Sequence, residues 1–221
     1  MLFADREESD GYTRREVDKI YQITMRSGQF FIAGAGTSDM VTKANAEISE
    51  VLFKAQNAGK DLAKDHKDLI ETALQRIHKQ YAANLKGSYL DLLIIFAPFD
   101  QRYVPILYKT ALAALIPESV YAAYGSGKVL CDYFAGRLYE YGRQEKDAMK
   151  VLAAFILREA ERAASGVGLG ADMWFIHEGD KSAHCIPTGA IRELQALIPE
   201  IQESIGSDWK DKVKIPQYLS G

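Results

Sequence analysis

The chain has 221 residues, of which 48% are hydrophobic and 26% are charged, and its formal net charge is -3 at pH 7. This length supports one domain with a substantial core, and the near balance of acids and bases excludes a basic face for nucleic acid or a membrane surface. The acids that crowd the first ten residues exclude a secretion signal, and no apolar run is long enough to span a bilayer, so we expect a cytoplasmic protein.

The first predicted elements are strands. Met1–Ala4 have the pattern of the end of an apolar strand, which stops at the charged run 5–10. A strand usually has roughly five or six residues, so this stub is short. The β-rich segments 19–25 and 29–36 are joined by a short turn that contains Gly28, and together they predict a hairpin.

Two helices are predicted next, because apolar residues recur there at steps of three and four. The first begins with Thr37 or Ser38 as its N-cap and ends at the segment "NAGKD". The second spans residues 62–85, and Gly87 follows it as a stop signal.

The chain then returns to strands, predicted at 89–98, 103–110 and 119–125. Pro105 lies in the middle one, which indicates a sheet edge or a bulge there, because proline has no N–H to donate to a neighbouring strand.

The last part of the chain is predicted to be mostly helical. Helices over 128–141 and 144–164 are separated by a break at Gly142, and a final helix runs from Thr188 to about Ser204. Before the final helix, the segment 171–186 reads as a hairpin turned at Gly179-Asp180.

Helices therefore come in pairs between groups of hairpin-linked strands. That order does not suit alternating βαβ crossovers, whereas it suits antiparallel sheets whose faces are covered by helix pairs. We predict an α+β fold, a four-layer αββα sandwich, built as a single domain over residues 1–221.

Cysteines and histidines give no strong metal or cofactor pattern. Cys131 and Cys185 lie far apart, and only Cys185 has an adjacent histidine, His184. Free thiols are the simplest interpretation, and a disulfide, a metal site or a Cys-His catalytic pair are the alternatives. We expect no cofactor and no metal.

Three stretches together resemble the proteasome-type amino-terminal-nucleophile hydrolases, which include the β subunits of the 20S core and the bacterial ring peptidase. "FADREESDG...VDKIYQI" is similar to the family's strand ending in Ala-Asp-Arg and the Lys-Ile that opens its next strand. "FFIAGAGTSDMV" is similar to its Ala-Gly entry to the first helix, and "YAAYGSGKVLCDYF" to its Gly-Ser-Gly turn before the third helix. The resemblance covers nearly the whole chain in order.

The resemblance also implies a first strand that begins with the catalytic threonine and precedes the position of Ala4-Asp5. We expect this segment, on the order of ten residues for one strand and a hairpin turn, to lie upstream of Met1. The family's threonine hydroxyl is activated by the α-amine of the same residue, so the nucleophile and its base are both absent from the chain.

Supporting catalytic residues follow from the resemblance. Lys19 would lie beside the nucleophile and stabilise the alkoxide, and Asp5 would orient Lys19 from the neighbouring strand. An ordinary surface ion pair between the two is the alternative. Ser126 would hydrogen-bond near the terminal amine, and its alternative role is helix capping.

The resemblance places substrate binding at the end of the segment "IAGAGTSD". The backbone N–H of Gly36, or of its neighbour Ala35, is the candidate oxyanion donor and substrate contact. The alternative is that glycine at this position only permits a tight turn from strand to helix.

One departure separates this chain from active relatives, which carry an Asp shortly before a Ser-Gly-Gly turn. Arg162 stands three residues before Ser165 here, and Asp172 lies on the strand that follows. Two functions therefore stay open, a threonine-type peptide or amide hydrolase and a non-catalytic ring subunit or interaction protein.

A nucleotide-binding function, suggested by the sequence "GSGK" at 125–128, lacks the residues of a phosphate loop. By resemblance the partners are a peptide or protein substrate and further copies in a ring. An ATPase activator is possible in such rings, and we expect neither nucleic acid nor membrane as a partner.

Overall fold

A computed structural model describes residues 1–9, 13–82, 89–100, 102–139, 145–176 and 183–198. The chain divides into two compact units. Unit 1 comprises Met1–Leu2, Asp18–Gly125 and Phe175–His184, and unit 2 comprises Phe3–Val17, Ser126–Trp174 and Cys185–Gly221. The single domain expected from the sequence stays a prediction.

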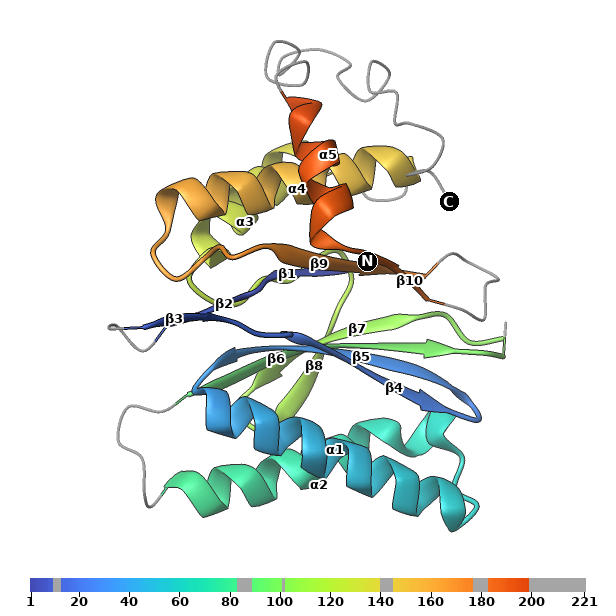
Figure 1. The fold of residues 1–221 in the computed structure, drawn as a ribbon. Helices are drawn as coiled ribbons and strands as arrows, with labels where there is room; N and C mark the ends of the chain where they lie inside the picture. Colours follow the sequence, from blue (N-terminus) through green and yellow to red (C-terminus); the bar gives the residue numbers. More distant parts are fainter. Residues whose placement is uncertain (10–12, 83–88, 101, 140–144, 177–182, 199–221) are drawn as a thin grey trace. The chain divides into compact units, whose positions relative to one another are not determined.

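Unit 1 contains a five-stranded antiparallel sheet in the order β4-β5-β6-β7-β8. The strands are β4 (Ile20–Met25), β5 (Gly28–Gly36), β6 (Leu90–Pro98), β7 (Ile106–Ala111) and β8 (Ala114–Glu118). Helices α1 (Ser38–Asn57) and α2 (Leu62–Ala82) cover one face of this sheet (Figure 1). Every second strand residue faces the helices, so fully buried side chains such as Phe30 and Ile94 pack with Ile48 and Leu74.

The predicted hairpin and both predicted helices of unit 1 are confirmed. Strands β4 and β5 pair with Met25 opposite Gly28. Helix α1 ends at Asn57, two residues before Gly59, which has φ +77°. The N–H groups of Gly59 and Lys60 donate to the carbonyls of Gln56 and Ala55, each at 3.0 Å. This Schellman arrangement needs a left-handed residue, which glycine adopts without steric cost.

The predicted strand at 119–125 is wrong, because the fifth strand of the sheet is β8, just before it. The β7–β8 turn lies between Ala111 and its partner Ala114, and Leu112 adopts φ +56° there. No glycine, proline or asparagine marks this turn, so local turn chemistry gave no signal. Pro105 precedes β7, which pairs on both sides, and the edge strand β8 carries Pro117 instead.

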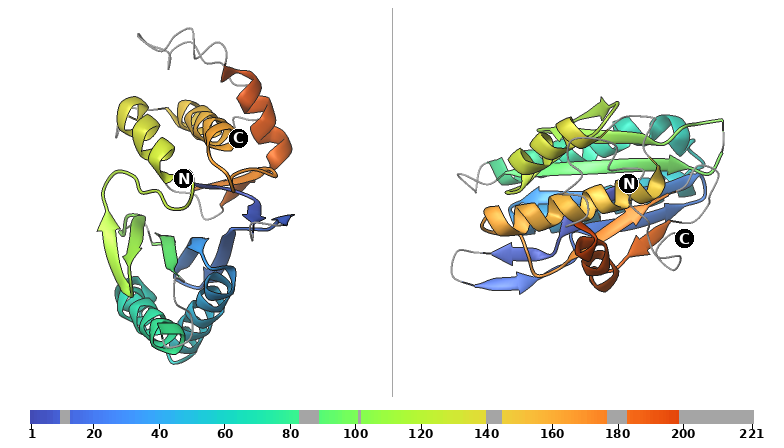
Figure 2. Two further views of the ribbon diagram at one scale, coloured as in Figure 1. Left: turned by 90° about the vertical axis from the view of Figure 1, so that its left-hand side faces the viewer. Right: turned by 90° about the horizontal axis from the view of Figure 1, so that it is seen from above.

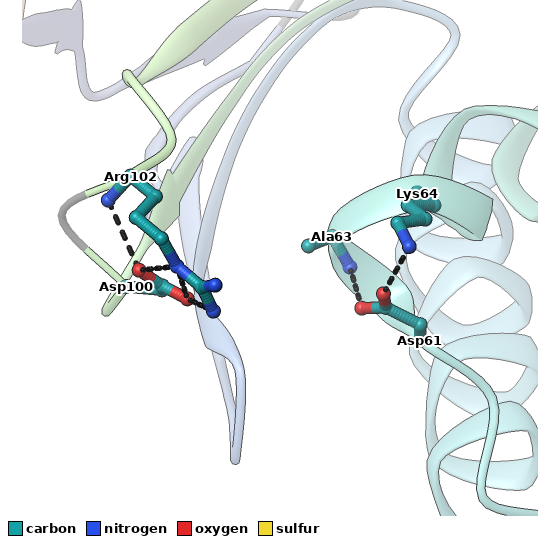
Figure 3. A network of polar contacts seen from close by, with 5 residues as sticks. All are labelled: Asp61, Ala63, Lys64, Asp100 and Arg102. Carbon is teal, nitrogen blue, oxygen red and sulfur yellow. Dashed lines mark hydrogen bonds and ion pairs between the residues drawn. The ribbon is translucent and has the colours of Figure 1, made fainter.

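The loops at one end of unit 1 are held by carboxylates. The Asp61 side chain accepts a hydrogen bond from the Ala63 N–H at 3.2 Å and so caps α2, while its other oxygen lies 3.5 Å from Lys64 Nζ (Figure 3). In the β6–β7 loop, Asp100 accepts from both the backbone N–H and the guanidinium of Arg102. Because of this Arg102 side-chain hydrogen bond, the pKa of Asp100 falls to about 2.

Unit 2 holds most of a second sheet, a hairpin and three helices (Figure 2). The sheet has the order β1-β9-β10, with strands β1 (Leu2–Asp5), β9 (Ala171–Phe175) and β10 (His184–Ile186), and the hairpin pairs β2 (Glu7–Ser9) with β3 (Arg14–Glu16). The helices are α3 (Lys128–Leu138), α4 (Lys146–Ala163) and α5 (Thr188–Ala196). Helix α4 packs against both α3 and α5, which explains why most of its residues are buried.

The predicted final helix is confirmed over its first part, as α5 (Thr188–Ala196). Residues 199–204 of that prediction lie outside the described residues. The predicted turn at Gly179-Asp180 lies outside the described residues. Among the residues that are described, no helix has the length and apolar character needed to cross a bilayer.

Candidate active site

The end of β5 presents a backbone amide at the sheet edge. Gly34 N–H donates to the Lys19 carbonyl at 3.4 Å on the β4 side, and Thr37 N–H donates to the Tyr89 carbonyl at 2.9 Å on the β6 side. Because N–H directions alternate along a strand, the Gly36 N–H is directed to the β4 side and the Ala35 N–H to β6. Strand β4 begins at Ile20, opposite Ala33, so it does not extend to Gly36.

Gly36 is held in a conformation that requires glycine. Its φ is +120°, and a Cβ at this position would overlap the Tyr89 carbonyl oxygen. The register therefore favours the Gly36 amide over the Ala35 amide as the donor that is open to a ligand. The alternative reading, a glycine that only permits the turn into α1, accounts for the φ angle but not for the direction of the N–H.

Lys19 lies immediately before β4 and is half-buried. Its carbonyl bond to Gly34 fixes its backbone beside the end of β5. Gly125, the residue before Ser126, approaches the same place, since a Cβ on Gly125 would lie 3.6 Å from that of Ala35. Unit 1 thus brings together Lys19, Ala35, Gly36 and the start of the Gly-Ser-Gly turn.

Asp5 ends β1 in unit 2 and accepts a hydrogen bond from the Glu7 N–H at 3.0 Å. The next residue, Arg6, donates its N–H to the carbonyls of Gly168 and Gly170 at 3.2 and 2.9 Å. Asp5 also lines a small pocket with Gly168, Gly170, Glu161 and Thr188. Strand β1 pairs with β9 in unit 2, whereas Lys19 precedes β4 of the five-stranded sheet in unit 1, so the expected pairing of Asp5 with Lys19 stays a prediction.

Ser126 precedes α3, whose N-cap is Gly127 and which has no side-chain capping bond. The Ser126 side chain therefore does not cap helix α3. A Cβ on Gly166 would lie 3.6 Å from the Ser126 hydroxyl oxygen, so Ser126 borders the glycine-rich turn 165–170. Asp5 lines the same small pocket as Gly168 and Gly170 of this turn, so both residues lie near the turn in unit 2.

The acid expected before this turn is absent, and Asp172 is engaged elsewhere. Arg162 is exposed at the end of α4, and its guanidinium lies 3.4 Å from Glu159. The Asp172 carboxylate lies 3.7 Å from the Arg6 guanidinium, which uses it in an ion pair. Asp172 is therefore not a replacement for the acid that Arg162 displaces.

The cysteine alternatives find little support. Burial raises the pKa of the Cys131 thiol to about 11, so this thiol is protonated near neutral pH and is a poor nucleophile. Cys185 is exposed, and the ring of the adjacent His184 stacks on Phe175 with a centroid distance of 5.2 Å. Within the described part of the chain, no group of three or more His, Cys, Asp or Glu residues is arranged to hold a metal ion.

One acidic residue of this region was missed by sequence reasoning. Asp91 lies on β6 directly opposite Ala35 and is half-buried. Burial raises the pKa of its carboxyl group above the usual 3.8. The signal was an acid inside the apolar run "YLDLLIIFAP", but its position next to Ala35 depends on strand register.

No family model matches the chain, and no curated protein does either. Solved structures do match over nearly the whole length. Anbu from Yersinia bercovieri, described as an ancestral beta-subunit, has a TM-score of 0.71 at 12% identity over 97% of this chain and 93% of that one.

The chain has the fold of Anbu. Anbu from Hyphomicrobium sp. strain MC1 gives a TM-score of 0.69 at 12% identity, with 97% of this chain and 94% of that chain covered. The Anbu complex of Pseudomonas aeruginosa, solved as a helical assembly, gives 0.66 at 12% identity, with 93% and 92% covered. The expected proteasome-like α+β class is therefore confirmed, as a likeness of fold to Anbu.

Proposed function

We propose that the chain is a proteasome-like subunit that hydrolyses peptide or amide bonds with a threonine-type amino-terminal nucleophile. The observation that carries this proposal is the Gly36 N–H, which is directed to the edge of β5 beyond the start of β4. A backbone amide in that position can donate to a developing oxyanion and pair with an extended peptide.

The remaining roles are assigned to residues that flank this amide or the glycine-rich turn. In the proposal, Lys19 stabilises the alkoxide of the nucleophile, Asp5 orients Lys19, and Ser126 hydrogen-bonds near the terminal amine. The backbone bond between Lys19 and Gly34 supports the first role. The position of Ser126 beside the turn 165–170 is compatible with the third role. The role of Asp5 rests on the resemblance of its motif alone.

We further propose that copies of the chain assemble into a cytoplasmic homo-oligomeric ring around these sites, with an activator still to be identified. Support comes from the shared fold with Anbu, for which a helical assembly has been solved. Gel filtration with light scattering on the purified protein measures this directly, and a strictly monomeric protein would contradict it.

The catalytic proposal is tested on protein purified from its native source. Intact mass and the amino-terminal residue are determined by mass spectrometry, and hydrolysis of a panel of fluorogenic peptides is measured. We expect a terminal residue with a hydroxyl or thiol, and a loss of about a hundredfold in kcat for Lys19→Ala. Lys60→Ala, an exposed lysine after α1, is the matched control and should keep wild-type activity.

A terminal residue with neither hydroxyl nor thiol, together with no hydrolysis, would overturn the enzymatic reading. The second candidate, a non-catalytic ring subunit, would then stand. It is favoured by one observation, the exposed Arg162 paired with Glu159 where active relatives have an acid. An oligomer that forms normally and hydrolyses none of the peptides is the result expected for it.

A further inference from the structure

Asp91 shares a sheet face with the candidate substrate-binding residues. Residues directly opposite on antiparallel strands have side chains on the same face, and Asp91 is opposite Ala35. The pair exchanges backbone hydrogen bonds, as the neighbouring Thr37-Tyr89 bond requires, so the two Cα atoms lie about 5.5 Å apart. Helices α1 and α2 cover the opposite face, which carries Ile32 and Leu92.

In the part of the chain that the structure describes, the carboxylate of Asp91 has no paired cation. Within the described residues it forms neither a hydrogen bond nor an ion pair. Lys109, on the same face of β7, is already paired with Glu118. The nearby Tyr124 hydroxyl donates to the Thr110 carbonyl. A half-buried acid without a partner is costly, and a cationic ligand would offset that cost.

The distance from Asp91 to a bound peptide suits a long basic side chain. A peptide paired with the Gly36 edge lies one strand spacing from β5, and β6 lies one spacing on the other side, so the two backbones are about 9.6 Å apart. An arginine or lysine side chain spans roughly 6 Å to its charged nitrogen, and the aspartate covers much of the rest.

Ala35 and its neighbour Gly125 are both small residues. Ala35 stands between the peptide edge and Asp91 on this face and has only a methyl group. Gly125 lies against Ala35 and has no side chain, although a Cβ there would come within 3.6 Å of the Ala35 Cβ. To reach the carboxylate, a long substrate side chain must lie across the Ala35 methyl group, beside Gly125.

We propose that Asp91 binds the basic side chain of an arginine or lysine in the peptide substrate and so sets a preference for basic peptides. The inference rests on the proposed function only in placing the peptide along the Gly36 edge. Asp91 is a specificity residue in this proposal and takes no part in bond cleavage.

The test compares two peptides that differ in one charge. A fluorescent peptide with a single arginine and the same peptide with citrulline, its neutral isostere, are titrated against the oligomeric protein and followed by anisotropy. We expect wild type to bind the arginine peptide at least about tenfold more tightly, and Asp91→Asn to bind both nearly equally. Asp68→Asn, an exposed acid on α2, is the matched control and should keep the wild-type ratio.

A second measurement covers the case in which Asp91→Asn does not fold. In wild type, the preference for arginine should disappear as the pH falls and Asp91 becomes protonated, because the arginine itself stays charged. Equal affinity for the two peptides in wild type at neutral pH, or binding of neither at the highest soluble concentration, would overturn the inference.

These outcomes separate the inference from the proposed function. Preference for the arginine peptide without any hydrolysis would support the role of Asp91 and contradict catalysis. Hydrolysis with equal use of both peptides would support catalysis and contradict the role of Asp91.

Discussion

Mild acid is expected to weaken unit 1 through the buried His66. This side chain on α2 is 3% exposed, with Nδ1 at 2.8 Å from the Leu62 carbonyl and Nε2 at 3.0 Å from the Tyr108 hydroxyl. A carbonyl only accepts, so Nδ1 carries the proton and Nε2 accepts from Tyr108. Burial lowers the pKa of His66 below 6.5, and the bond to the Leu62 carbonyl only partly opposes this.

The sign of the effect follows from proton binding. Below about pH 6.5 the unfolded chain binds a proton at this histidine, whereas the folded chain does so only at a lower pH. The free energy of unfolding therefore falls as the pH is lowered through this window, by at most about 1.4 kcal/mol per pH unit. Between pH 7 and pH 5.5 the loss is at most about 1 kcal/mol, the limit reached if folded His66 stays unprotonated throughout.

Urea unfolding followed by circular dichroism at the two pH values measures this loss. His66→Gln cannot ionise, so it should be less stable than wild type at pH 7 but lose up to about 1 kcal/mol less on acidification. Gln75→Ala, at an exposed position of the same helix, is the control and should keep the wild-type pH dependence. An equal pH dependence in wild type and His66→Gln would refute this account.

Three further substitutions test the local physics. Gly59→Ala meets no atom within 4 Å and should lower the stability by only the cost of the left-handed conformation, about 1 kcal/mol. Gly36→Ala should lower the stability clearly more in thermal melts, because its Cβ would overlap the Tyr89 carbonyl, and equal losses would contradict that close approach. Asn45→Leu should raise the free energy of unfolding by about 1 kcal/mol, since neither polar atom of this buried amide has a partner in the described chain; a loss in urea unfolding would argue for a bound partner. Glu7→Gln should lower the free energy of unfolding by about 2 kcal/mol, because buried Glu7 accepts a hydrogen bond at 2.6 Å from Arg14. Glu8→Gln, in an exposed pair with Arg15, should lower it by under about 1 kcal/mol, and similar losses for the two variants would show that burial does not strengthen the Glu7 pair.

Local sequence patterns predicted much of unit 1. The hairpin of β4 and β5 follows from two β-rich runs around a short turn, and α1 follows from apolar residues at helical spacing that ends before Gly59. Each of these patterns involves residues that are close in the sequence, so it can be recognised without knowledge of the tertiary structure. The strand β8 was missed because its turn contains Leu112 in a left-handed conformation, which only pairing with β7 explains.

The candidate site shows the same division. The residue types of Lys19, Gly36 and Ser126 were marked by their motifs, and so was the absence of an acid at Arg162. Which amide faces the open edge was decided by tertiary structure, because the direction of the Gly36 N–H depends on its register with β4 and β6. The position of Asp91 in the site was decided wholly by tertiary structure. Pairing between strands from distant parts of the chain sets it opposite Ala35, and no local pattern carries the information that fixes such a register.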